Sequence, residues 1–311
     1  MGDTRNCGDL FSLHRVVIEL CEAGNGLARR AAPSGMRQPL PSRDVLIGIV
    51  ESLRTVLFPG HFGSSEISDD SVAFHMGAIL DGVASSLQIQ IKRSLCFACE
   101  SEVPECSECE QRASEIARRF LARLPEVRRL LASDVQAAYD GDPAATGPDE
   151  AILCYPGLMA LTNFRLAHEL YGLGVSLVPR MITEHAHSLT GIDIHPGATI
   201  GESFFMDHGT GIVIGETAEI GRRVRIYQGV TLGAKSFPLD TDGRPIKGIL
   251  RHPLVEDDVI IYSGATILGR VTIGEGAVIG GNVWLTGDVP AGSRITQAQV
   301  EKARFEDGAG I

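Results

Sequence analysis

An aliphatic residue recurs every six positions through the second half of this 311-residue chain. The positions are Ile194, Ile200, Met206 and Ile212, then Ile214, Ile220, Ile226 and Leu232, and after a break Val255, Ile261, Ile267, Ile273, Ile279 and Leu285. This period fits neither the 3.6-residue turn of an α-helix nor a simple array of hairpins. It is typical of a parallel β-helix, in which six residues form one flat side of a prism and three sides make a coil of about 18 residues. We expect the aliphatic side chains to point inward and to stack from coil to coil, about 4.8 Å apart.

The break in the period falls on "AKSFPLDTDGRPIKGIL", residues 234–250. This stretch contains proline and glycine and shows no periodicity. It predicts a loop that leaves the wall of the prism. Long excursions of this kind in compact domains are usually functional or disordered.

The first half of the chain is predicted to be helical, because apolar residues recur there at three- and four-residue spacings. Pro125 is expected to end one helix near Leu124, and Pro156 to restart another that stops at a glycine. The expected helical segments are 45–59, 71–95, 109–139, 149–174 and 178–188. The fold class is therefore α+β, with a helical domain at 1–190, a β-helix at 191–295 and a flexible tail at 296–311.

The charge and hydropathy of the chain exclude some classes of function. The formal net charge of −11 argues against nucleic acid and anionic membrane as partners. The chain has no uncharged apolar run of about 18 residues, so no membrane-spanning helix is expected. The first residues lack the apolar core of a signal peptide. The sequence therefore predicts a cytoplasmic protein.

Four of the seven cysteines form a cluster, "CFACESEVPECSEC". Cys96 and Cys99 make one C-x-x-C pair, and Cys106 and Cys109 make another. Two such pairs can complete a tetrahedral zinc site, and an iron–sulfur centre also takes four thiolates. The alternative is a helical turn that carries ordinary thiols.

Three strings in the repeat region carry a family resemblance. They are "GIDIHPGATIGESFFMDHGTGIVIGETAEIGRRVRIYQGVTLGA", "RHPLVEDDVIIYSGATILG" and "IGEGAVIGGNVW". Together with "DGDPAA" (140–145), they resemble the serine O-acetyltransferases, which belong to the hexapeptide-repeat acyltransferases. The resemblance covers about residues 135 to 295. It implies a left-handed parallel β-helix that assembles as trimers, often paired into hexamers, with active sites between neighbouring prisms.

The resemblance also implies a reaction. The hydroxyl of L-serine attacks the thioester of acetyl-CoA and gives O-acetylserine and CoA, the activating step of cysteine biosynthesis. A serine hydroxyl is a weak nucleophile near neutral pH, and histidine is the side chain best suited to act as its base. His208 of "MDHGTG" matches the catalytic histidine of the family, Asp193 of "DIHP" the carboxylate that orients it, and His252 a second active-site histidine.

Further positions match groups that bind the substrates in the family. Asp142 and Asp207 suit the ammonium group of serine, and Arg251 suits its carboxylate. Ala234 lies where the family presents a backbone N–H to the oxyanion, although glycine is more usual there. The residues that match the path of the CoA arm are Ser263, Gly264, Gly280 and Gly281. Without the resemblance, Asp142 would be interpreted as a turn residue, and Arg251 and His252 as the solvated end of a loop. The glycines would be interpreted as ordinary turn glycines.

Three other interpretations of the repeat region remain open. The first is a hexapeptide acetyltransferase with a different hydroxyl acceptor, such as a sugar or an antibiotic. The second is a β-helix carbonic anhydrase in which His195, His208 and His252 bind zinc between subunits. The third is a scaffold without catalytic activity.

The tail "TQAQVEKARFEDGAGI" is polar and contains glycine. Serine acetyltransferases that pair with cysteine synthase have a similar acidic, glycine-rich tail that ends in isoleucine. The resemblance implies that Ile311 and its carboxylate could enter the O-acetylserine site of that partner. The alternative is a tail without a partner.

Overall fold

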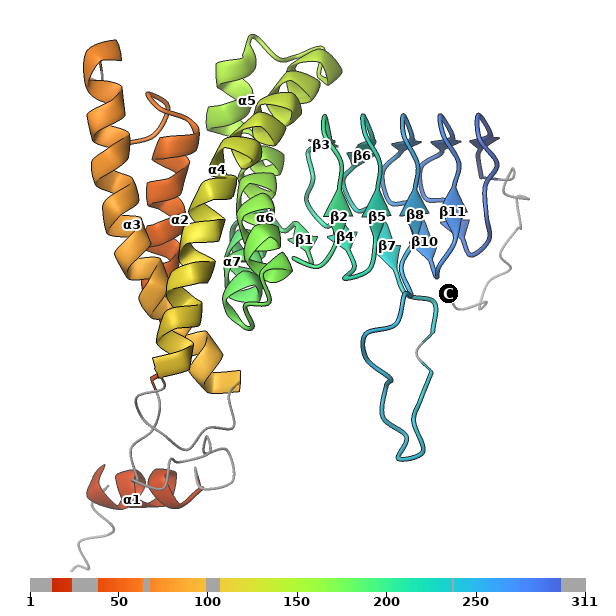
Figure 1. Cartoon of the computed structure of the whole chain (residues 1–311). Coiled ribbons are helices and arrows are strands. Elements are labelled where there is room, and N and C mark those ends of the chain that lie inside the picture. The colour runs from red at the N-terminus through yellow and green to blue at the C-terminus, as the bar shows by residue number, and fades with distance from the viewer. Residues whose placement is uncertain (1–12, 24–38, 64–67, 99–106, 237, 298–311) are drawn as a thin grey trace, which may run out of the picture.

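The computed structural model describes residues 13–23, 39–63, 68–98, 107–236 and 238–297. Helices lie at one end of the molecule and a row of stacked β coils at the other (Figure 1). The described helices are α1 (Leu13–Ala23), α2 (Arg43–Leu57), α3 (Asp69–Ala98), α4 (Ser107–Gly141), α5 (Pro148–Cys154), α6 (Pro156–Gly172) and α7 (Val178–Thr190).

Helix α4 runs without a break through Pro125, so the predicted end near Leu124 is wrong. A proline inside a helix removes one hydrogen bond and costs about 3 kcal/mol. Phe120, Leu124 and Val127, on both sides of the proline, are buried in the same core. Burial of each such side chain contributes about 1.5–3 kcal/mol, which together outweighs the cost of the proline.

The predicted segment 149–174 folds as two helices, α5 and α6, and the second starts at Pro156 as expected. Helix α6 is followed by Gly174, whose φ of 76° is left-handed. The N–H of Val175 then donates to the carbonyl of Leu170 at 3.1 Å, which is the long hydrogen bond of a Schellman motif. The glycine stop is therefore confirmed.

Helix α3 contains a segment, Ser71–Ala98, that is long and apolar enough to cross a membrane by length and composition. The sequence predicts no such helix. The finding is weak support for a membrane span, because the core helix of a globular protein passes the same test. Only 11% of the apolar window is buried, although Val83, Leu87 and Ile91 lie in the core and α3 packs on α2 and α4.

The described strands are short, parallel and arranged on three faces of a prism. Face A consists of β1, β4, β7, β10 and β13; face B of β2, β5, β8 and β11; and face C of β3, β6, β9, β12 and β14. Their bounds are β1 Asp193–Ile194, β2 Thr199–Ile200, β3 Phe205–Asp207, β4 Val213–Ile214, β5 Glu219–Ile220, β6 Arg225–Tyr227, β7 Thr231–Gly233, β8 Leu254–Val255, β9 Ile260–Ile261, β10 Thr266–Leu268, β11 Thr272–Ile273, β12 Val278–Ile279, β13 Trp284–Leu285 and β14 Arg294–Ile295.

The register of the strands confirms the six-residue period and the left-handed β-helix of hexapeptide repeats. Ile194 pairs with Ile214, twenty residues later, and Ile214 pairs with Leu232 after eighteen. The first coil is two residues longer than the next, which accounts for the two-residue shift of the period after Ile212. All the repeat positions are buried except Leu285 in the last coils, which is partly buried.

The turns between faces form three corners, which we name corner AB, corner BC and corner CA after the faces that they join. The aperiodic segment 234–250 leaves the prism at corner AB, between β7 and β8, as predicted (Figure 1). Corner BC carries exposed ion pairs between successive coils, such as Arg222 with Asp257 and Arg223 with Asp258, each at 2.7 Å. Most of the predicted site residues of the prism lie at or next to the other two corners.

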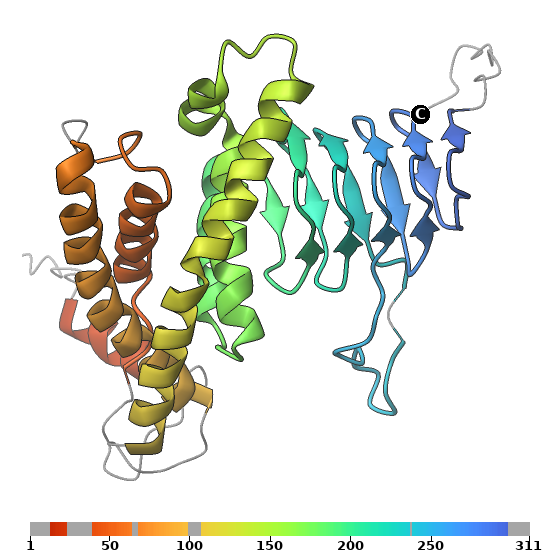
Figure 2. The ribbon, with the colours of Figure 1, turned by 45° about the horizontal axis from the view of Figure 1, so that its top comes forward.

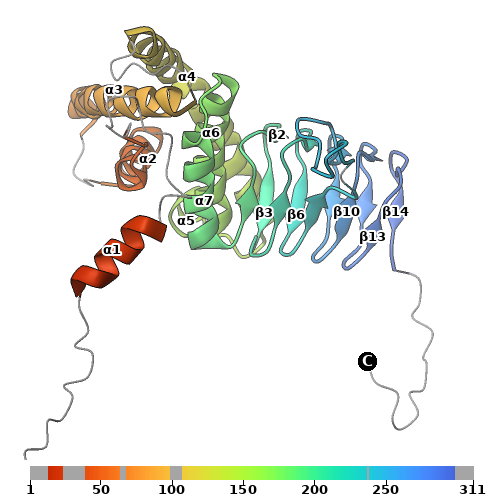
Figure 3. The same cartoon turned by 90° about the horizontal axis from the view of Figure 1, so that it is seen from below.

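The helical part packs on the first coil of the prism, and the remaining coils extend away from it in one row (Figure 2 and Figure 3). Two glycines allow helices α4 and α6 to approach strand β3 closely. A Cβ on Gly141, at the end of α4, would lie 2.7 Å from Cδ1 of Phe205, and a Cβ on Gly157, at the start of α6, would lie 2.8 Å from the carbonyl oxygen of Met206. Helices α4 and α6 are therefore both fixed against β3.

A buried ion pair strengthens this junction. Arg165 of α6 donates to both carboxylate oxygens of Asp134 on α4, at 2.6 and 2.8 Å. The same guanidinium donates to the carbonyl of Gly201, and Asp134 accepts the N–H of Phe204. Because the pair satisfies backbone groups of the prism, it joins two helices to corner BC.

Candidate active site

His208 directly follows strand β3 and begins corner CA. Its backbone is left-handed, with a φ of 58°, and Gly209 and Gly211 after it also have positive φ values. This conformation costs a non-glycine residue about 1–2 kcal/mol, so the turn maintains it against an intrinsic penalty. The imidazole projects from the wall, 75% exposed, with Nε2 3.7 Å from Oδ1 of Asp207.

Asp142 lies in the turn after α4, and two donors fix its carboxylate. Oη of Tyr155 donates to Oδ2 at 2.6 Å, and the backbone N–H of Ala144 donates to Oδ1 at 2.8 Å. These hydrogen bonds, the one from Tyr155 first, lower the pKa of Asp142, and the charge of protonated His208 acts in the same direction. An ionised carboxylate from the helical part therefore lies in the electrostatic field of His208.

His252 lies at the base of the long loop, on corner AB, which is a different edge of the prism. The side chain is buried, and its Nδ1 accepts the backbone N–H of Thr217 at 3.0 Å. Burial first, and then the charge of Arg251, lower the pKa of His252 to about 4. Since Nδ1 is an acceptor, the neutral ring carries its proton on Nε2. At neutral pH this ring is a hydrogen-bond donor rather than a base.

Arg251 lies beside His252 and is held by the preceding coil. Its Nη2 donates to Oε2 of Glu216 at 2.7 Å, and its backbone N–H donates to Oγ1 of Thr217 at 3.0 Å. Oη of Tyr171 donates to the other oxygen of Glu216 at 3.2 Å. The side chain of Arg251 is 21% exposed, so the guanidinium reaches the surface in a fixed orientation.

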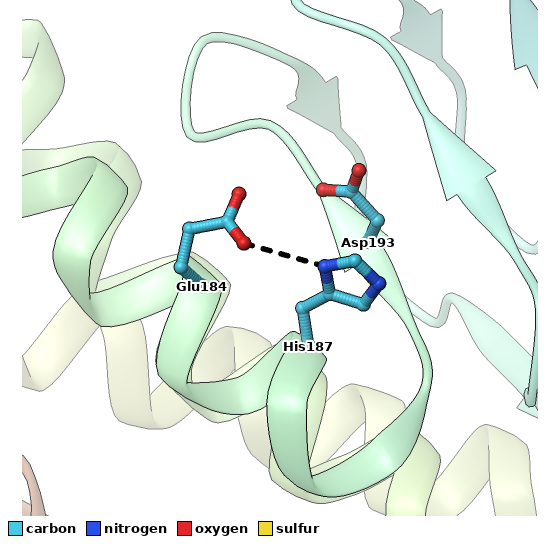
Figure 4. A group of neighbouring side chains, drawn as sticks. All are labelled: Glu184, His187 and Asp193. Carbon is cyan, nitrogen blue, oxygen red and sulfur yellow. Dashed lines mark hydrogen bonds and ion pairs between the residues drawn. The ribbon is translucent and has the colours of Figure 1, made fainter.

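Asp193 lies in β1, where side chains of α7 reach it (Figure 4). Nδ1 of His187 lies 3.3 Å from Oε2 of Glu184, and Nη2 of Arg180 lies 3.6 Å from Oδ1 of Asp193. Among the ion pairs of the described residues, none joins Asp193 to His208. The predicted contact between these two residues therefore stays a prediction.

Glu184, His187 and Asp193 each offer one ligand atom, and these atoms lie within 4.8 Å of one another. A metal could use such a spacing. However, the guanidinium of Arg180 pairs with both carboxylates and already supplies the positive charge that they need. We therefore interpret the group as an ion-pair network at the junction between α7 and the prism.

The residues predicted to follow the CoA arm lie on corner CA, in later coils than His208. They are Ser263, Gly264, Gly280 and Gly281. Position 264 requires glycine, because its φ is 69° and a Cβ there would lie 2.3 Å from Oδ1 of Asn282. Ala234, by contrast, follows β7 on corner AB, and its φ is not left-handed, so alanine fits the position.

Apart from Asp193, the predicted catalytic, oxyanion and serine-binding residues thus fall into two groups. Corner CA and the helical part carry Asp142, Asp207 and His208, whereas corner AB carries Ala234, Arg251 and His252. No hydrogen bond or ion pair between described residues joins the two groups. We call them the CA half-site and the AB half-site.

Sequence reasoning missed the side chains that hold these groups in place. Glu216 and Thr217 occupy the corner AB position one coil before Arg251 and His252, as the pairing of β5 with β8 requires. The repeat register could have identified them. Tyr155 had no such signal, because its contact joins two turns of the helical part.

Of the predicted metal ligands, Cys99 and Cys106 lie outside the described residues, as does Ile311. Cys96 lies near the end of α3 and Cys109 near the start of α4. Both belong to the helical core, in which Cys109 is buried and Cys96 partly buried. The two helices that bracket the cluster are therefore neighbours.

Known proteins with similar sequences and folds share one activity in their names. Residues 252–287 match the family described as bacterial transferase hexapeptide (six repeats). A protein named serine acetyltransferase, plasmid, from Synechococcus elongatus is 53% identical over 97% of this chain and 95% of its own length. The serine acetyltransferase of Bacillus subtilis is 46% identical over 52% of this chain and 70% of its own. The solved structure of Entamoeba histolytica serine acetyltransferase 1 in complex with L-cysteine has a TM-score of 0.68 and 35% identity, and it covers 91% of this chain and 97% of its own.

Proposed function

Since the chain belongs to the serine acetyltransferases, which are hexapeptide-repeat acyltransferases, we propose that the CA half-site of one copy and the AB half-site of a neighbouring copy form its active site. The enzyme transfers the acetyl group of acetyl-CoA to the hydroxyl of serine. The observation that supports a shared site is the division of the candidate residues between two corners of one prism. Hexapeptide-repeat prisms that associate around a three-fold axis bring unlike corners together.

Serine binds through its charged ends. The carboxylates of Asp142 and Asp207 take the ammonium group, and the guanidinium of Arg251 takes the carboxylate in a two-pronged contact. The hydroxyl is then held close to the exposed imidazole of His208. This arrangement converts a bimolecular reaction into a reaction between positioned groups.

His208 is the general base. Its imidazole takes the hydroxyl proton as the serine oxygen attacks the carbonyl carbon of the thioester. A tetrahedral oxyanion forms, and we assign its stabilisation to the backbone N–H of Ala234. The C–S bond then breaks, the proton on His208 passes to the sulfur, and O-acetylserine and CoA leave.

His252 has a different role from His208. Because its pKa is about 4 and its Nδ1 accepts a backbone N–H, it is neutral and offers Nε2–H. We assign it to the binding of substrate oxygen rather than to proton removal. The CoA arm follows corner CA past Ser263, Gly264, Gly280 and Gly281, where the small residues leave room. Asp193 is proposed to orient His208.

The direct test is CoA release from acetyl-CoA with and without L-serine. We expect His208→Ala to lower the serine-dependent rate by about 10²–10⁴-fold, the usual contribution of a general base. His14→Ala, on the exposed face of α1, is the control and should leave the rate unchanged. A rate for His208→Ala within about threefold of wild type would contradict the assignment. Preference for another hydroxyl acceptor over serine would contradict the substrate.

We also propose that Cys96, Cys99, Cys106 and Cys109 hold one structural metal centre, zinc or iron–sulfur. The C-x-x-C spacing supports it, and so does the position of Cys96 and Cys109 on neighbouring helix ends. The metal would link α3 to α4. Elemental analysis of protein purified without chelators should find about one zinc per chain, or iron. Finding neither would reject the centre.

A partner is proposed for segment 296–311. The sequence of this segment supports an association with cysteine synthase through Ile311. We propose that the enzyme itself assembles as trimers or paired trimers. Removal of Ile311 should abolish co-purification with cysteine synthase while acetyl transfer continues. Equal co-purification of both forms would reject the association. We also propose a cytoplasmic location, which cell fractionation tests.

A further inference from the structure

Among the residues that the structure describes, Tyr155 is the side chain of the helical part that donates a hydrogen bond to a proposed substrate-binding carboxylate. Its Oη donates to Oδ2 of Asp142 at 2.6 Å, a short bond typical of a hydroxyl and an ionised carboxylate. The N–H of Ala144 takes the other oxygen at 2.8 Å. Among the described residues, each oxygen of Asp142 thus accepts one hydrogen bond and can accept another from a ligand.

The two residues reach this contact from different segments, and both segments are fixed to strand β3. Gly141, next to Asp142, is pressed against Phe205, and Gly157, two residues after Tyr155, is pressed against the carbonyl of Met206. Strand β3 leads directly into His208. The close packing of these two glycines on β3 thus holds Tyr155 and Asp142 in a defined position relative to His208.

The hydrogen bond and the charges around Tyr155 raise the pKa of its hydroxyl. The hydrogen bond to Asp142 comes first among the causes that raise the pKa of the Tyr155 hydroxyl, and Glu150 and Asp207 act in the same direction. The raised pKa favours the protonated phenol, which is the form that donates to Asp142.

We propose that Tyr155 is a positioning residue for substrate selection: it fixes the Asp142 carboxylate so that its free lone pairs meet the ammonium group of the amino-acid acceptor. The inference rests on the proposed function of Asp142. Without the hydroxyl, the carboxylate gains freedom to rotate about its side-chain bonds and loses part of its alignment.

The test is Tyr155→Phe, which keeps the ring and removes only the donor. The KM for L-serine should rise about tenfold, equivalent to about 1.4 kcal/mol, while kcat changes less and the KM for acetyl-CoA stays the same. The same variant should leave kcat/KM for 3-hydroxypropanoate unaltered, because that acceptor has the hydroxyl and the carboxylate but no ammonium group. Tyr139→Phe, on the exposed side of α4, is the matched control.

The outcomes separate this inference from the function on which it rests. If wild-type protein releases no CoA with serine, the proposed function fails. If wild type is active but Tyr155→Phe has an unchanged KM for serine, or loses efficiency equally with both acceptors, the positioning role is wrong. A second measurement is the double variant with Asp142→Asn, in which loss of the Tyr155 hydroxyl should have little further effect.

Discussion

Gly215 lies directly beneath the imidazole of His252 on corner AB. A Cβ at this position would lie 2.0 Å from Cδ2 and 2.1 Å from Nε2 of the ring. These distances are far below contact, and the ring belongs to a buried side chain that cannot move without breaking its hydrogen bond to Thr217. The absence of a side chain at residue 215 therefore defines the position of His252.

This contact predicts that Gly215→Ala displaces His252 and disables the AB half-site. We expect kcat/KM for serine to fall by about 10²-fold, as for a misplacement of about 1 Å at a reacting centre. Gly287→Ala is the control, since a Cβ there meets nothing within 4 Å. The measurement is steady-state kinetics together with a thermal melt of each variant. Full activity of Gly215→Ala would show that the position of His252 does not matter.

Whether a site residue could be predicted from the sequence depends on what places it in the site, the repeat or the packing of distant segments. His208 and His252 sit on a repeating wall, so their corners could be read from the period once the register was known. The partnership of Asp142 with Tyr155 depends on how two turns pack on β3, which no local pattern encodes. The same holds for the contact of Asp193 with Arg180, which the sequence did not predict.

Helices α4 and α6 are elements whose junction depends on one buried ion pair. Asp134 is completely buried and the side chain of Arg165 is 4% exposed, so each charge depends on the other and on backbone groups of the prism. Removal of one partner leaves an uncompensated charge, which typically costs about 3–5 kcal/mol. An exposed pair within one helix, such as Arg118 with Glu115, has no such dependence.

We therefore expect Asp134→Asn to lower the free energy of unfolding by about 3–5 kcal/mol. Glu115→Gln, its control, should change the free energy by no more than about 0.5 kcal/mol. Denaturant unfolding followed by circular dichroism measures both. Equal stability of the two variants would mean that the junction does not rely on the ion pair.

Elements were predicted well where their signal was local. The inward residues of each coil lie in a fixed six-residue frame, so the strands and the loop at 234–250 followed from the sequence. The continuous helix α4 did not, because the proline rule is local whereas the burial of Phe120 and Val127 is tertiary.

At the scale of the whole molecule, the two half-sites predict complementation between inactive chains. His208→Ala and His252→Ala should each be inactive alone, since each damages a different corner. Random mixing of the two in equal amounts should restore about a quarter of the wild-type activity, because one site in four then combines two intact corners.

The matched control mixes His208→Ala with Asp142→Asn. Both changes fall in the CA half-site, so no combination of chains contains an intact one, and activity should stay at the level of the single variants. CoA release after co-expression or refolding of mixed chains provides the measurement. Absence of recovery in the first mixture would mean that the active site lies within one chain.

Leu232 pairs directly with Ile267 on the next coil, although segment 234–250 lies between them in the sequence. This has a consequence for how such a gene can change in length. An insertion or deletion inside a face would shift every inward side chain after it out of the core, unless it removed or added a complete coil of about 18 residues. At a corner, an insertion of any length can leave the wall and return to the same register. Variation in length among related genes should therefore accumulate at corners, where a new segment can acquire a role without any cost to the core.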